Sequence, residues 1–86
     1  MNINELSNLI KKKISNEINC DFLDIQDKTY LHIKHDTHEK GKFHIKIILK
    51  STELTKTNKI LSTRKIYNIL SNELKNYIHS IQIELI

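Results

Sequence analysis

The chain contains no proline, one glycine and one cysteine among its 86 residues. A single cysteine excludes an internal disulfide framework and a cysteine-rich zinc site. With few residues that enforce turns, long helices and strands must be joined by polar loops. No apolar run approaches the roughly 18–20 residues that cross a membrane, and the first residues lack the charged-then-apolar pattern of a signal peptide. We therefore expect a cytoplasmic protein without membrane association, or an organellar matrix protein if a presequence is missing.

The length suits one domain spanning residues 1–86, and a hydrophobic content of 38% suffices for one modest core. A chain of this size buries only roughly 60–65% of its unfolded surface, which leaves little room for a deep catalytic pocket. The sequence has no serine on a glycine-flanked elbow and no glycine-rich phosphate loop. These absences argue against an enzyme and favour a protein that works by binding.

The net charge is +4, which is compatible with nucleic-acid binding. Lysine, however, outnumbers arginine thirteen to one, and asparagine and isoleucine are also abundant. A/T-rich coding sequences produce this combination, so the charge is explained either by a nucleic-acid ligand or by the genome alone. Composition does not separate the two explanations.

Two segments carry apolar residues at helical spacing. The stripe of the first segment consists of Ile3, Leu6, Ile10, Ile14 and Ile18. Asn2 or Asn4 can cap this helix. The stripe of the second segment, which begins near Ile60, consists of Ile66, Ile69, Leu70, Leu74 and Tyr77. Ser62 or Thr63 can cap this second helix, which we expect to be long.

Three segments alternate between apolar and polar residues as β-strands do. They are residues 20–27, residues 43–50 and the end of the chain around residues 79–85. The first two follow one another without a crossover helix, so we expect them to pair antiparallel. Their connection, residues 28–42, is long, and such loops are usually functional or disordered. The predicted fold is α+β, with helices packed on one face of a three-stranded sheet.

The chain is rich in histidine, a residue that binds transition metals through its imidazole nitrogens. The five histidines are His32, His35, His38, His44 and His79. The spacing of the loop histidines matches neither a helical pair nor a zinc knuckle, so solvated loop histidines remain an alternative to a metal site. His79 shares the strand parity of Ile81 and Ile83, so its ring should lean toward the core side, where a satisfied core histidine is the alternative. For Cys20 we expect the role of a small buried hydrophobe.

A series of short motifs keeps one order along the chain. The motifs are Phe22–Asp27 with Thr29 and His32, His44–Ser51, Arg64–Tyr67 with Leu70, Glu73–Leu74, and Ile78–Ile81. The series resembles the BolA-like family over nearly the whole chain, including that family's loop His or Cys and its closing Ile/Val-His-Ala-Leu. The chain departs from the family at Lys56, where a glycine is usual. It also departs at residues 62–64, where the family's Arg-His-Arg is reduced to Arg64.

The resemblance implies an αββααβ domain similar to the class II KH arrangement. It also implies a partner, a monothiol glutaredoxin, with which such proteins share a [2Fe–2S] cluster in cluster trafficking or in iron or redox sensing. The glutaredoxin and glutathione would each supply a thiolate, and the isolated chain, expected to be a monomer, would bind no cofactor. By the resemblance, His79 and His32 would be the ligands from this chain. The alternates are His35, His38 and His44.

Two other functions remain open. The KH-like resemblance also implies a nucleic-acid-binding transcriptional regulator of stress or morphology responses, with Arg64, Lys65 and Lys75 on the phosphate backbone. The chain lacks the Gly-x-x-Gly loop with which KH domains clamp nucleic acid, and it has a single arginine for reading bases. DNA binding should therefore be weak and steeply salt-dependent. The second alternative is a structural interaction module whose histidines are solvated.

Overall fold

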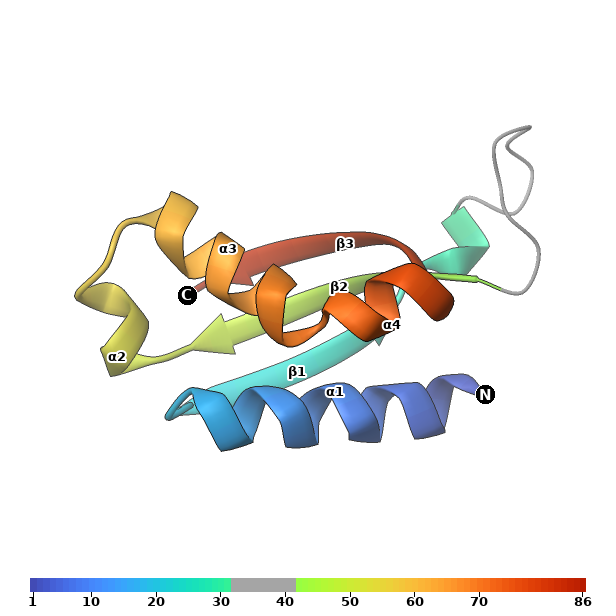
Figure 1. The fold of residues 1–86 in the computed structure, drawn as a ribbon, viewed down its shortest axis with the longest axis horizontal. Helices are drawn as coiled ribbons and strands as arrows, with labels where there is room; N and C mark the ends of the chain where they lie inside the picture. The colour runs from blue at the N-terminus through green and yellow to red at the C-terminus, as the bar shows by residue number, and fades with distance from the viewer. Residues whose placement is uncertain (32–41) are drawn as a thin grey trace.

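The computed structural model describes residues 1–31 and 42–86. In those residues, three strands form one sheet in the order β1–β2–β3, and helices lie against one of its faces (Figure 1). The strands are β1 (Phe22–Asp27), β2 (Phe43–Lys50) and β3 (Ile78–Leu85). The helices are α1 (Ile3–Glu17), the short 3₁₀ helix η1 (Thr29–Leu31), α2 (Thr52–Thr55), α3 (Lys59–Ile69) and α4 (Ser71–Asn76). This arrangement confirms the predicted α+β fold.

The central strand β2 has one neighbour of each orientation. β1 pairs with it antiparallel, as expected, and β3 pairs with it parallel. A parallel neighbour requires a crossover connection, which α2, α3 and α4 provide. Ile47 stands opposite both Ile25 of β1 and Ile83 of β3, so a row of isoleucines crosses the sheet. Side chains of the alternate parity form the second face, which no helix of the described residues covers (Figure 1).

The core lies between the sheet and the long helices. Its buried side chains are Leu6, Ile10, Ile14, Ile18, Ile45, Ile47, Leu49, Leu54, Ile66, Leu70 and Ile78. The first predicted helical stripe is confirmed, with Ile3 packed at the margin of the core. Asn2 caps α1, because its side-chain oxygen accepts a hydrogen bond from the backbone N–H of Glu5 at 2.9 Å. Among the described residues, no helix is both long enough and apolar enough to span a membrane.

The helix α3 begins earlier than the sequence pattern indicated. Asn58 is the cap, since its side-chain oxygen accepts a hydrogen bond from the backbone N–H of Leu61 at 2.8 Å. The predicted caps Ser62 and Thr63 were therefore wrong, and both lie inside the helix. Ser62 is buried, and its hydroxyl is 2.7 Å from the hydroxyl of Thr57. Asn58 and the two predicted caps lie within six residues of one another, and Asn58, the first of them in the chain, caps the helix.

The expected long second helix is divided at Leu70. The backbone there departs from helical geometry, with φ −99° and ψ 17°, and the chain continues as α4. After this bend, Glu73 of α4 lies against α1 and is 1% exposed. Its Oε2 accepts hydrogen bonds from Lys13 Nζ at 2.6 Å and from Asn72 Nδ2 at 3.4 Å. The Lys13–Glu73 ion pair thus ties the first helix to the last one.

The pKa of Glu73 reflects two opposing effects. Burial disfavours the charged carboxylate and by itself would raise the pKa. The hydrogen bond from Lys13, those from the backbone and Asn72, and the positive charge of Lys13 outweigh burial and hold the pKa below its ordinary value. Because the folded-state pKa is the lower one, the pair stabilises the fold above the ordinary carboxyl pKa. This contribution is lost as the pH falls through the folded-state pKa.

We expect Lys13→Met to destabilise the protein by leaving a buried carboxylate without its ammonium partner. Removal of one member of a buried ion pair costs about 3–5 kcal/mol. The side chain of Lys13 is 34% exposed, so water compensates in part, and we expect a loss of about 2 kcal/mol in the free energy of unfolding at neutral pH. The loss should shrink at acidic pH, where Glu73 is protonated. Urea unfolding followed by circular dichroism at stepwise lower pH measures both effects.

Lys12→Met is the matched control, because Lys12 is an exposed neighbour on the same helix. It removes the same charge without affecting Glu73. Equal losses of stability in the two variants, or a loss in Lys13→Met that does not depend on pH, would contradict the account of the ion pair.

Candidate functional site

A β-bulge opens strand β3. Phe43 of β2 pairs with Ile78, but the next residue, His44, pairs with Ser80, so the register shifts at this point. His79 is the extra residue of β3. A bulge redirects side chains, and here it interrupts the alternation of the strand. Ile78 is 2% exposed and belongs to the core, whereas His79 is exposed.

The prediction that His79 leans toward the core side was therefore wrong. It assumed strict alternation back from Ile81, and the bulge lies between the two residues. The sequence did contain a signal for the bulge. Ile78 and Ile81 both pack in the core although they are three residues apart, and strict alternation would place them on opposite faces.

The bulge brings the rings of His44 and His79 together. Their ring centroids are 4.8 Å apart, and the ring planes are tilted by 39°. His44 is 5% exposed, and its side chain has the parity of the face that no described helix covers. Its Nδ1 lies 2.7 Å from the hydroxyl oxygen of Ser80. We call His44 and His79 the histidine pair, and Ser80 its serine.

Two residues that follow β1 form hydrogen bonds to the backbone of His44. Its N–H donates to the hydroxyl oxygen of Thr29 at 3.1 Å, and its C=O accepts from the N–H of Lys28 at 2.7 Å. The hydroxyl of Thr29 in turn donates to a carboxylate oxygen of Asp27. These bonds fix the start of β2 against the end of β1, so the position of the buried imidazole is set by both strands.

A hollow of about 280 Å³ lies beside His44. Its lining residues are Lys28, His44, Ile45, Lys46, Ser80, Ile81 and Gln82. Two of these residues are lysines and none is acidic, although Lys46 also pairs with Glu84 at 3.4 Å. The lining is therefore basic, which suits an anionic ligand or a metal cluster of net negative charge.

The predicted ligands are only partly placed by the structure. His32, His35 and His38 lie outside the described residues. Of the other two, the structure brings His79 next to His44. Within residues 1–31 and 42–86, no group of three or more His, Cys, Asp or Glu side chains could hold a metal ion. The described residues thus supply a pair of imidazoles.

The basic residues predicted to contact nucleic acid lie on α3 and α4. Arg64 is an exposed residue of α3. Its neighbour Lys65 pairs with Glu53 at 3.0 Å, and the two side chains are 46% and 44% exposed. Lys75 is an exposed residue of α4. None of the three lines the hollow beside the histidine pair.

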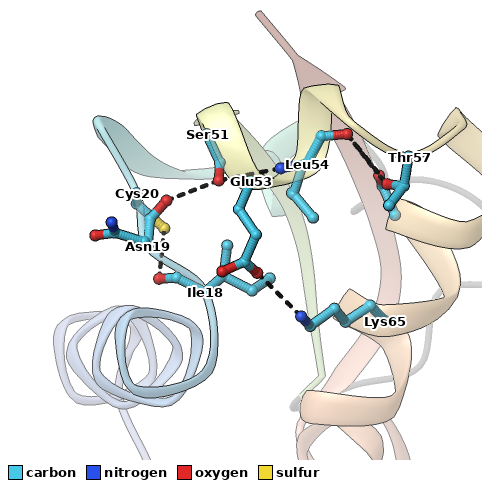
Figure 2. Close-up of polar contacts among 9 residues, drawn as sticks. Ile18, Asn19, Cys20, Ser51, Glu53, Leu54, Thr57 and Lys65 are labelled. Atoms are coloured by element: carbon cyan, nitrogen blue, oxygen red, sulfur yellow. Dashed lines mark hydrogen bonds and ion pairs between the residues drawn. The ribbon is translucent and has the colours of Figure 1, made fainter.

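Cys20 lies near the other end of β2, beside Ser51 (Figure 2). The hydroxyl of Ser51 donates to the carbonyl of Asn19 at 2.7 Å, and the thiol of Cys20 donates to the carbonyl of Ile18 at 3.4 Å. Cys20 is half-buried against the core, which agrees with the expected apolar role. Burial raises the pKa of its thiol, and the negative charges of Glu53 and Asp21 add to the shift.

The sequence is similar to a protein family and to a curated relative. The pattern of the family described as "BolA-like protein" matches residues 14–86. A protein from Haemophilus influenzae named "DNA-binding transcriptional regulator BolA" is 28% identical over 80 residues, covering 93% of this chain and 75% of the relative.

The fold is similar to solved structures. The BolA domain of SufE1 from Arabidopsis thaliana superposes with a TM-score of 0.78 and 22% identity, over 99% of this chain and 92% of that domain. BolA1 from Arabidopsis thaliana superposes with a TM-score of 0.77 and 22% identity, over 92% of this chain and 87% of that protein. At this identity the two structures support the fold alone.

We expect Cys20 to react slowly with iodoacetamide at neutral pH, because the thiolate is the nucleophile and its pKa is raised. The half-maximal rate should lie at a higher pH for the folded protein than for the same protein unfolded in urea. Glu53→Gln should shift the folded profile to lower pH, since it removes a nearby negative charge. The control Glu5→Gln, at the start of α1, should leave the profile unchanged. If the profiles of the folded and unfolded protein coincided, the raised pKa of the Cys20 thiol in the folded state would be refuted.

Proposed function

Because this chain belongs to the BolA-like protein family, we propose that it works by binding a monothiol glutaredoxin and sharing a [2Fe–2S] cluster with it. In this proposal, His79 is a cluster ligand, and the chain takes part in iron–sulfur cluster trafficking or in iron or redox sensing. The glutaredoxin and glutathione supply the thiolates. The chain itself catalyses no reaction.

The observation that carries the proposal is the pairing of His79 with His44. Two imidazoles on one metal ion, with metal–nitrogen bonds of about 2.0–2.1 Å, have ring centroids about 5 Å apart in tetrahedral geometry. The observed separation is 4.8 Å. This separation supports a centre to which this chain contributes two of the ligands. The resemblance assigns the second ligand to His32, whereas His44 is the imidazole found next to His79.

The chemistry of the pair suits a cluster that is held and passed on. Histidine in place of thiolate on one iron raises the reduction potential of a [2Fe–2S] cluster. Binding through imidazole also depends on pH, because a protonated ring is no ligand. Lys28 and Lys46 line the adjoining hollow, and their charges complement the negative charge of a thiolate-ligated cluster.

Anaerobic reconstitution tests the proposal. The protein is mixed with a monothiol glutaredoxin, glutathione, iron and sulfide, and the visible absorption and circular dichroism spectra are recorded. We expect a spectrum that differs from that of the cluster on glutaredoxin alone, because nitrogen replaces sulfur on one iron. His79→Ala should restore the spectrum of glutaredoxin alone. His32→Ala and His44→Ala, compared in parallel, identify the second ligand.

Gln82→Ala is the control, since Gln82 is exposed on the same strand and lines the same hollow but is not an iron ligand. Its spectrum should match that of the wild type. A wild-type mixture with an unchanged spectrum would rule out ligation by this chain. A His79→Ala mixture identical to that of the wild type would rule out His79 as a ligand.

A second candidate function is DNA binding, favoured by the name of the Haemophilus influenzae relative. Arg64, Lys65 and Lys75 are exposed on α3 and α4. The turn between α2 and α3, residues 56–58, contains no glycine, so a clamp of the KH type is not available there. Three cations on a helical surface suit contact with phosphates without reading of bases.

For this candidate, we expect weak binding without sequence preference. Neutralising three phosphates predicts a loss of affinity of about 40-fold between 50 and 200 mM salt. Arg64→Gln should weaken binding equally for all sequences, because it removes one phosphate contact. Gel-shift titrations with two unrelated duplexes measure both effects. The control Lys11→Gln, on α1, should bind as the wild type does. A preference for one duplex that persists at 200 mM salt would contradict phosphate-only binding.

A further inference from the structure

We propose that Ser80 is a positioning residue that holds the imidazole of His44 in the form needed next to His79. In this proposal, the hydroxyl oxygen of Ser80 accepts a hydrogen bond from the Nδ1–H of His44, so that the proton stays on Nδ1 and the lone pair is on Nε2. The inference rests on the proposed function, since a ligand nitrogen must carry a lone pair.

The geometry for this role comes from the register shift. Because His79 is the extra residue of the bulge, Ser80 is the residue that stands opposite His44. Its hydroxyl oxygen lies 2.7 Å from Nδ1 of His44, a short distance for a nitrogen–oxygen hydrogen bond. Without the bulge, His79 would occupy the position opposite His44, and no hydroxyl would reach the ring from β3.

The neighbourhood of the two groups favours Ser80 as the acceptor. A neutral imidazole has one proton, and the partner of one nitrogen decides where that proton resides. Ser80 is exposed, so its hydroxyl can donate its own proton to water while it accepts from His44. The ring of His44 is buried, so it depends on partners within the protein for its orientation.

Groups that form hydrogen bonds to metal-binding histidines affect the affinity of the site for its metal. A metal-binding histidine usually donates its other ring N–H to a neighbouring group, and loss of that group lowers metal affinity about 10–100-fold. Ser80 can be such a partner for His44. Its hydroxyl contacts Nδ1, which leaves Nε2 to bind the metal, and it lies in the same strand as His79. The histidine pair and its serine therefore form one unit.

The first test uses the free chain with ¹⁵N-labelled histidine and no metal. Two-bond ¹H–¹⁵N correlation spectra at slightly alkaline pH report which ring nitrogen carries the proton. We expect His44 to be protonated on Nδ1 in the wild type. In Ser80→Ala, at least half of the molecules should move the proton to Nε2. Ser80→Thr keeps a hydroxyl and should restore the wild-type spectrum, while Gln82→Ala should not change it.

The second test measures how long the cluster survives in the glutaredoxin complex when an iron chelator is added. Ser80→Ala should lose the cluster about 10-fold faster than the wild type, and Ser80→Thr should match the wild type. A tautomer unaffected by Ser80→Ala, or Nε2 protonation in the wild type, overturns the role of Ser80 whether or not a cluster forms. An unaltered visible spectrum of the wild-type mixture overturns the proposed function instead, and the tautomer result then still stands.

Discussion

The shift in register at the start of β3 is the constraint on which the site depends. If β3 continued without a bulge after Ile78, His79 would pair with His44 in the sheet. The bulge instead gives that position to Ser80 and leaves His79 as the extra residue, 4.8 Å from the ring of His44. The shift keeps both Ile78 and Ile81 in the core, so burial of two apolar side chains stabilises the irregular backbone. Core packing and the placement of the histidines are thus two consequences of one inserted residue.

Much of the fold could be predicted from the sequence because its helices and strands bury simple stripes. The stripe from Leu6 to Ile18 gave the first helix, and the alternation around Ile45 and Ile47 gave the central strand. Residues of similar capping ability could not be ranked. Asn58, Ser62 and Thr63 lie within six residues of one another, and capping propensity alone does not decide between them. The division of the second helix at Leu70 also went unpredicted, because the apolar spacing continues past the bend.

For the site, the sequence supplied the residue types and the structure supplied their arrangement. The family resemblance pointed to His79 without any knowledge of the bulge. The proximity of His44 could not be deduced, because it depends on the register between strands that are far apart in the chain. Ser80 was missed for the same reason, since a serine in an exposed strand position has no distinctive pattern. Residues 32–41, with three predicted or alternate ligands, lie outside the described part of the chain. The comparison of His32→Ala with His44→Ala distinguishes the two candidates for the second ligand.

The central claim is that imidazole nitrogen from this chain binds iron in the complex with glutaredoxin. The most direct measurement is pulsed electron paramagnetic resonance on the reduced cluster, with only this chain labelled with ¹⁵N-histidine. The account predicts strong hyperfine coupling to ¹⁵N that disappears in His79→Ala and persists in Gln82→Ala. A reduced cluster that shows no ¹⁵N coupling from this chain would contradict the claim.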